Sequence, residues 1–291
     1  MNRFLSIMIV VVIIAIAGAG GLYWWQLRKL GPSGKSVAVP EVTAPAPPAS
    51  AAAAPTEPAI QFPIDAAGSP DKTALPALAD SDSYFAAAIN ALVSRKDQAA
   101  FLQLDKFATR VVATVDNLAR PHAAPMLWPV NPTPGRFTTA EVGAASTTIS
   151  AANSQRYTPV VRFIESVDTT KAVALYVSAY PLFQQAYEEL GYPRRYFNDR
   201  LVAVIDHLLA TPTASEGLGV NLTEVKGPIA AARPWVRYEF SDATLEALSS
   251  GQKMMLRAGP DNQARLKIKL QEIRRQIAGA GMTKPGAAAK P

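Results

Sequence analysis

Four carboxylates gather near one predicted helical corner, where a pair of them could serve as a general acid and a general base. They are Glu188, Glu189, Asp199 and Asp206. A glycosidase-type mechanism needs two carboxyl groups held roughly 5 to 10 Å apart across a cleft, and spacing along the chain does not supply that distance. Helical periodicity instead predicts that Glu188 and Glu189 are solvated and that Asp206 projects away from the apolar stripe of its helix. A cell-wall glycan or peptide hydrolase using carboxylates near the corner is kept as an alternative function, with no catalytic residue assigned.

Neither the two histidines nor a glycine-containing segment near the N-terminus matches the pattern of a metal or nucleotide site. His122 and His207 lie in different segments, and His207 lacks the second ligand one helical turn away that a helical zinc site requires. The chain has no cysteine, which excludes thiolate ligands. Gly31–Ser36 ends like a phosphate-binding loop, but Lys29 occupies the place of its first glycine and no flanking strand and helix are predicted. We therefore expect no metal, no cofactor and no nucleotide.

Tyrosines and arginines indicate a binding surface instead. Tyr176, Tyr180 and Tyr187 share one helical face, which predicts core positions with locally bonded hydroxyl groups. The corner that follows mixes aromatic, guanidinium and amide side chains, a composition enriched at interaction surfaces. Its candidate binding residues are Tyr192, Arg194, Arg195, Tyr196 and Asn198.

The corner must be positioned by the helices on either side of it, within residues 168–212. Apolar residues recur at helical spacing over residues 173–190, and Gly191 and Pro193 then end that helix. A second apolar stripe begins at Phe197, so the two helices form a predicted αα-hairpin. Pro181 lies inside the first helix, where it predicts a kink near residues 179–181.

The segments before the hairpin predict further helices and a short extended region. Helices are expected over residues 80–92, capped by Asp80, Ser81 or Asp82, and over residues 104–118. Both should pack on the hairpin. Residues 122–149 are broken by proline and read as short strands or an ordered loop, and a helix with Pro159 in its first turn follows.

The segments after the hairpin predict one strand and two helices. Residues 235–240 alternate strictly between two faces, which indicates a strand. One face carries Val236, Tyr238 and Phe240, and the other carries Trp235, Arg237 and Glu239. A helix capped by Ser241 or Asp242 should end at Gly259–Pro260. The final helix carries an apolar stripe and a basic surface, which would contact anionic lipid or an acidic polymer or, on the plainer reading, simply be solvated. The fold class is therefore mainly α, a compact helical domain with a few short β-strands.

The N-terminal segment has the length and composition of a transmembrane helix. Phe4–Leu27 contains no charged side chain in 24 residues, enough to cross a hydrocarbon layer of ~30 Å. Its anchor residues, including an interfacial aromatic cluster, are Phe4, Tyr23, Trp24, Trp25 and Leu27. A cleaved signal peptide is the alternative, because Ala17–Ala19 fits a small-x-small cleavage pattern.

Two features give opposite orientations for the domain that follows. Three basic residues follow the predicted membrane helix, Arg28, Lys29 and Lys35, whereas only Arg3 precedes it. Because basic residues favour the cytoplasmic side, this count favours a cytoplasmic domain and hence a membrane adaptor. The Ala/Pro-rich spacer resembles tethers that hold bacterial envelope domains away from the inner membrane. We favour a single-pass protein of the bacterial inner membrane with a periplasmic domain.

The net charge of +6 does not indicate a nucleic-acid-binding protein. Residues 1–79, 80–249 and 250–291 carry partial charges of +1, −2 and +7, so the basicity belongs to the C-terminal segment. The predicted organisation is an anchor over residues 1–29, a disordered spacer over 30–79, a helical domain over 80–278 and a disordered tail over 279–291. Nucleic acid is not expected as a partner.

Several runs resemble one bacterial family. Val112–Leu118, Ala179–Pro193, Phe197–Pro212 and Ser241–Arg274 are similar to the domain of unknown function 3014 family, with the tyrosine-proline corner as the most specific part. The resemblance spans residues 80–278 and implies an uncharacterised, single-pass, membrane-anchored protein with one mostly helical domain. It implies no catalytic residues. We expect a non-enzymatic envelope protein whose helical domain binds another protein or an envelope component.

Overall fold

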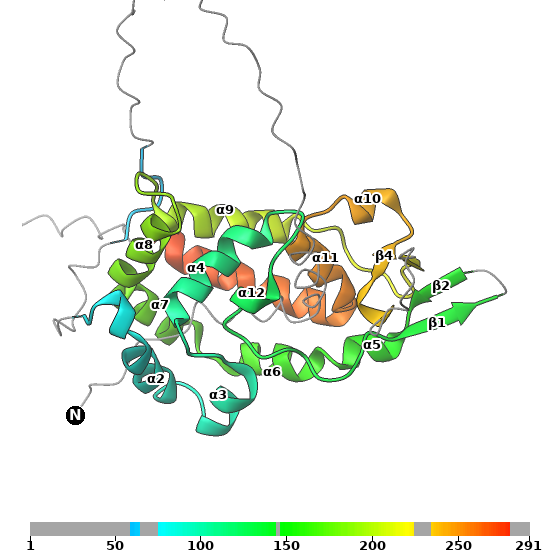
Figure 1. Ribbon diagram of the computed structural model, residues 1–291, viewed down its shortest axis with the longest axis horizontal. Coiled ribbons are helices and arrows are strands. Elements are labelled where there is room, and N and C mark those ends of the chain that lie inside the picture. The colour runs from blue at the N-terminus through cyan, green and yellow to red at the C-terminus, as the bar shows by residue number, and fades with distance from the viewer. Residues whose placement is uncertain (1–58, 65–74, 144–145, 224–233, 280–291) are drawn as a thin grey trace, which may run out of the picture.

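The computed structural model describes residues 59–64, 75–143, 146–223 and 234–279. It is mainly helical with two short antiparallel strand pairs, as predicted (Figure 1). In chain order, with η denoting 3-10 turns, the elements are η4 (Leu78–Asp80), α2 (Asp82–Asn90), α3 (Arg95–Phe101), α4 (Phe107–Leu118), η5 (Pro125–Leu127), β1 (Thr139–Val142), β2 (Ser146–Ile149), α5 (Ala151–Gln155), α6 (Thr158–Ser166), α7 (Thr169–Ser178), α8 (Tyr180–Glu189), α9 (Phe197–Leu209), β3 (Val220–Leu222), η6 (Pro234–Val236), β4 (Tyr238–Phe240), α10 (Ala243–Glu246), α11 (Ser250–Arg257) and α12 (Pro260–Gly279).

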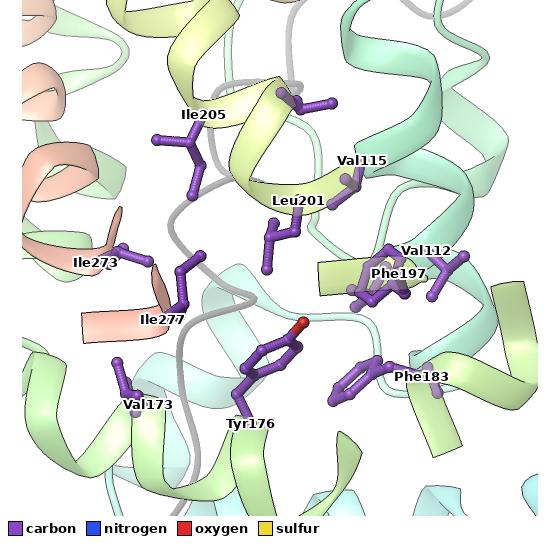
Figure 2. Close-up of a cluster of buried hydrophobic side chains, with 14 of the residues drawn as sticks. Val112, Val115, Val173, Tyr176, Phe183, Phe197, Leu201, Ile205, Ile273 and Ile277 are labelled. Carbon is purple, nitrogen blue, oxygen red and sulfur yellow. The ribbon is translucent and has the colours of Figure 1, made fainter. Parts of the chain in front are cut away.

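Helices α4, α9 and α12 form the centre of the domain. Helix α9 packs against both α4 and α12, and α8 packs against α4 (Figure 1). Figure 2 shows Phe183 and Phe197 side by side near Val112 of α4, with Tyr176 between them and Ile277 of α12; Ile273 belongs to the same buried cluster. All of these side chains are buried, and burial of each contributes about 1.5 to 3 kcal/mol to folding. The predicted apolar stripe of the final helix is therefore confirmed.

The predicted long helix over residues 173–190 is two helices, α7 and α8. Ala179 caps α7 with a backbone that leaves the helical region (φ −92°, ψ 4°), and Pro181 lies in the first turn of α8. Proline is tolerated there because first-turn N–H groups have no helical partner. The proline thus begins a new helix, and the predicted kink is a break. Helices α8 and α9 follow each other around the corner as expected, but each packs more extensively on α4 than on the other.

The strands lie at the end of the domain opposite α2 and α8 (Figure 1). β1 pairs with β2 and β3 with β4, and an isolated bridge between Thr148 and Gly219 links the two pairs. The predicted strand over residues 235–240 is correct only for its second half, because residues 234–236 form η6. There the guanidinium of Arg136 lies 4.0 Å from the centre of the Trp235 ring.

The helix predicted after Asp242 is also two helices, α10 and α11. The Asp242 side chain accepts a hydrogen bond from the N–H of Thr244, which caps α10. Ser249 and Gln252 then form a reciprocal capping box that begins α11. The predicted end at Gly259 is confirmed, since its φ of +86° is a left-handed conformation that favours glycine.

The predicted membrane anchor falls outside the described residues. Its residues are Phe4, Tyr23, Trp24, Trp25 and Leu27. Most of the predicted spacer (30–58 and 65–74) and the tail from residue 280 fall outside as well. Among the helices that the structure describes, none is long and apolar enough to cross a membrane.

Part of the predicted spacer belongs to the domain. Residues 59–64 lie beside the connection between α8 and α9 (Figure 1), and Ile64 is buried there. Leu75 and Leu78 also pack on the main core. The expectation of a disordered spacer up to residue 79 therefore does not hold for residues 59–64 and 75–79, whose apolar side chains the domain covers.

Candidate functional site

The corner, residues 191–198, is held in one conformation by its main chain. Gly191 has a φ of +112°, its N–H donates to the Glu188 carbonyl, and the N–H of Tyr192 reaches back to the Tyr187 carbonyl. This is the pattern by which glycine ends helices. The ring of Tyr192 stacks on that of Tyr187, with centroids 4.6 Å apart. The prediction that Gly191 ends the first helix is confirmed.

Gln184 of α8 connects the corner to α8, the helix that precedes it, through hydrogen bonds. Its amide nitrogen donates to the Arg195 carbonyl at 2.9 Å, and its amide oxygen accepts from the N–H of Phe197 at 2.9 Å and from the Tyr180 hydroxyl at 3.0 Å. The same nitrogen donates to Glu188. Gln184 was missed in the sequence because its partners depend on how the corner folds back.

Asp116 of α4 connects the corner to the centre of the domain through hydrogen bonds. Its carboxylate accepts hydrogen bonds from Arg120, from the hydroxyl of Tyr192 at 3.2 Å and from Nε of Arg200 at 3.0 Å. Its side chain is only 6% exposed, so these partners replace the water that a buried carboxylate needs. The available sequence signal was an acidic residue inside the apolar run of α4.

The buried tyrosines form the floor beneath the corner. The Tyr176 hydroxyl donates to Asn198, whose main-chain N–H donates to the Tyr180 hydroxyl. Burial raises the pKa of Tyr176 and of Tyr180, so both hydroxyls stay protonated. The prediction that Tyr176, Tyr180 and Tyr187 are core residues is confirmed.

The segment at residues 60–64, which we call the resident segment, lies on the start of α9. The N–H groups of Gln61 and Phe62 donate to the two carboxylate oxygens of Asp199, at 3.0 and 2.8 Å. The N–H of Ile64 donates to the Tyr196 hydroxyl at 2.7 Å. No feature of the Ala/Pro-rich composition indicated these contacts.

The five candidate binding residues have different environments. Asn198 is fully buried, and its amide nitrogen donates to the carbonyls of Phe62 and Ile277, so it does not form part of the exposed surface. Tyr192 and Tyr196 are half-buried and bonded to their own chain. Arg194 and Arg195 are exposed, and their guanidinium groups have no ion-pair or hydrogen-bond partner among the described residues.

The four carboxylates considered for catalysis have separate partners. Glu188 and Glu189 accept from the amides of glutamines one turn earlier. Asp199 binds the resident segment, and Asp206 forms an ion pair with Arg274 of α12. Each carboxylate is thus bonded to its own chain, and the geometry favours no pair for acid/base chemistry.

Three further features bear on cofactor binding: His207, the arrangement of the possible metal ligands, and one surface indentation. Nε2 of His207 lies 2.8 Å from the Ser249 hydroxyl, and partial burial with the nearby charge of Arg200 lowers its pKa. Among the described residues, no three His, Cys, Asp or Glu side chains are grouped so that they could hold a metal. An indentation lined by Ser150, Glu216 and Arg257 has an empty volume of about 260 Å³, open solvent included, which is small for an organic ligand.

The basic surface of α12 is largely engaged by the domain itself. Arg265 pairs with Glu165 and Arg274 with Asp206, while Lys267 and Lys269 donate to the carbonyls of Thr211 and Val167. Those ion pairs and hydrogen bonds fix α12 against its neighbours. The plainer reading, a packed amphipathic helix, agrees with these contacts.

Comparison with known proteins gives one match. A family model described as a protein of unknown function, DUF3014, matches residues 107–274, more than half of the chain. The matched region begins at α4 and ends within α12, so it includes the corner and its supports. No curated protein and no solved structure matches the chain.

Proposed function

The chain belongs to the DUF3014 family of proteins of unknown function, and from that premise we propose that it is a non-enzymatic binding protein of the bacterial envelope. Its helical domain binds another protein or an envelope component through the corner. The family match confirms the resemblance seen in the sequence over residues 107–274. A family described only as of unknown function assigns no reaction, so the proposal rests on the geometry of the corner.

One observation supports the proposal most. Two neighbouring guanidinium groups have no ion-pair partner among the described residues, and they lie on a corner whose conformation is fixed by hydrogen bonds. Arg194 and Arg195 are exposed, and Leu190, a few residues earlier in the chain, is 41% exposed. Gln184 donates to the Arg195 carbonyl, and Asp116 accepts from the hydroxyl of Tyr192, so both ends of the corner are held. A preorganised surface loses little conformational entropy on binding, and arginine beside aromatic and apolar groups is typical of interface hot spots. Two unneutralised positive charges favour a partner with acidic groups.

The membrane attachment is part of the same proposal. Phe4–Leu27 would span the inner membrane, and the Ala/Pro-rich segment would carry the domain into the periplasm. A topology reporter fused after Ala278 tests this orientation. A partner confined to the envelope would then meet the corner at a distance from the bilayer set by the tether.

Charge reversal at the corner tests the binding proposal. A photo-crosslinking side chain at Glu189, in the last turn of α8, should capture a discrete partner in intact cells. The R194E/R195E variant should lower the yield of that product at least about tenfold, because hot-spot arginines each contribute more than ~1 kcal/mol. Its thermal midpoint should stay near that of the wild type, since both side chains are exposed and neither guanidinium forms a hydrogen bond or ion pair with the described residues.

The matched control reverses two exposed charges elsewhere. Arg95 and Lys96 begin α3, away from the corner in Figure 1, and are exposed. R95E/K96E should leave the cross-linked product unchanged. Equal yields from wild type and R194E/R195E, or no product from position 189, would contradict the proposal.

A further inference from the structure

The resident segment is recognised mainly through its main chain. Three of its N–H groups and the carbonyl of Phe62 bond to side chains of the α9 start. Only two of its side chains are covered, Phe62 in part and Ile64 almost fully, whereas Ile60 is 55% exposed. Such recognition requires two apolar side chains and a backbone that bends at Gln61 and Phe62, so that two successive N–H groups reach one carboxylate.

Two of the receiving side chains are also held by contacts that do not involve the resident segment. Asn198 is fixed by Tyr176 and by the Ile277 carbonyl, and the ring of Tyr196 packs on Tyr180 with centroids 5.1 Å apart. Asp199 lies in the first turn of α9, where the helix dipole favours its negative charge. Its two oxygens accept two successive N–H groups, and hydrogen bonds to an ionised acceptor are strong ones.

We propose that Tyr196, Asn198 and Asp199 form a recognition site for a short peptide segment with a bent backbone, and that the resident segment occupies it until a partner's segment replaces it. This inference rests on the proposed function, because it identifies the kind of partner the corner binds. The partner contributes a short apolar segment of the resident type, with an aromatic and an aliphatic residue around a proline. The exposed Arg194 and Arg195 adjoin the site in the chain, so a partner can contact both.

Occupation by the chain itself makes binding competitive. A segment tethered to its own site acts at an effective concentration that is typically millimolar for short linkers. A peptide in solution must therefore displace it, and disabling the resident segment should expose the site. The same competition would keep the site closed to weak or non-specific peptides.

Peptide binding to the full chain in detergent micelles tests the inference. The probe is a fluorescent capped peptide with the sequence of residues 59–64, AIQFPI. F62S/I64S removes the two covered side chains from the resident segment. Fluorescence anisotropy should show binding to this variant at least about tenfold tighter than to wild type.

Two matched controls separate main-chain recognition from simple hydrophobic adhesion. The same peptide with an N-methyl group on its phenylalanine keeps every side chain but lacks one N–H that Asp199 accepts. It should bind F62S/I64S at least about tenfold more weakly than the parent peptide. Adding Asp199→Ala to F62S/I64S should weaken the parent peptide by a similar factor.

A second way of opening the site covers the case in which F62S/I64S fails to fold. Gln61→Pro removes one N–H to Asp199 and keeps both apolar side chains, and circular dichroism reports whether each variant is folded. Absence of peptide binding to every folded variant, or binding that ignores the N-methyl group, would overturn the inference. A position-189 cross-link that R194E/R195E leaves unchanged, or no cross-linked product at all, would instead overturn the proposed function, so the two failures are distinguishable.

Discussion

Replacing Asp116 with alanine should destabilise the domain by about 3 kcal/mol, the cost typical of removing one partner from a buried charge network. The variant leaves Arg120 and Arg200 close together without the carboxylate between them, and Tyr192 loses an acceptor. Partial exposure of both arginines keeps the loss below that of a fully enclosed network. Urea denaturation followed by circular dichroism measures the change in the free energy of unfolding.

Asp105 provides the matched control for that substitution. Its carboxylate also pairs with an arginine, Arg110 at 3.2 Å, but its side chain is 72% exposed. Asp105→Ala should therefore cost less than about 1 kcal/mol. Equal losses from the two substitutions would show that burial of the Asp116 network does not stabilise the corner.

Gly251→Ala should destabilise the domain by about 2 kcal/mol, although alanine is the better helix former. A Cβ at this position would lie 2.6 Å from Cδ2 of Leu208 and 2.9 Å from the carbonyl oxygen of Leu118. The approach is this close because the Ser250 hydroxyl bonds to the last carbonyls of α4, and its N–H donates to the carbonyl of Arg120 just beyond that helix. The carbonyl is backbone, so α11 must move away from α4 to admit a methyl group.

Gly279→Ala, in the last residue of α12, is the corresponding control. A Cβ there meets no described atom within 4 Å. The free energy of unfolding should remain within about 0.5 kcal/mol of wild type, as is usual for surface sites. If Gly251→Ala were as neutral as Gly279→Ala under urea, the close packing of α11 on α4 would be refuted.

The helices at the centre of the domain could be predicted from the sequence. α4, α9 and α12 each present one face to the core, and that periodicity is a local property of the chain. The breaks were harder to predict. Pro181 begins α8, Ser249 begins α11, and Ser94 caps the unpredicted α3 by accepting from the N–H of Asp97. Each break carries a start signal that the longer apolar period obscured.

The position of the corner could be predicted from the sequence, but the contacts of its residues could not. The corner was located correctly because Gly191 and Pro193 end a helix. Asn198 was assigned to its surface, but its amide reaches Phe62 and Ile277, which are far away in the chain. Contacts of such sequence separation follow from the assembled fold. The resident segment was hidden for the same reason, inside a run whose composition is typical of a tether.

Amide hydrogen exchange of Gln61, Phe62 and Ile64 in the full chain tests most directly whether the corner holds a peptide segment. These three N–H groups donate to Asp199 and Tyr196, so in the wild type they should exchange at least about tenfold more slowly than in Asp199→Ala. Amides of α4 should exchange equally slowly in both proteins. Exchange of the three amides in the wild type at the rate of an unstructured peptide would contradict the recognition of residues 60–64 by the corner.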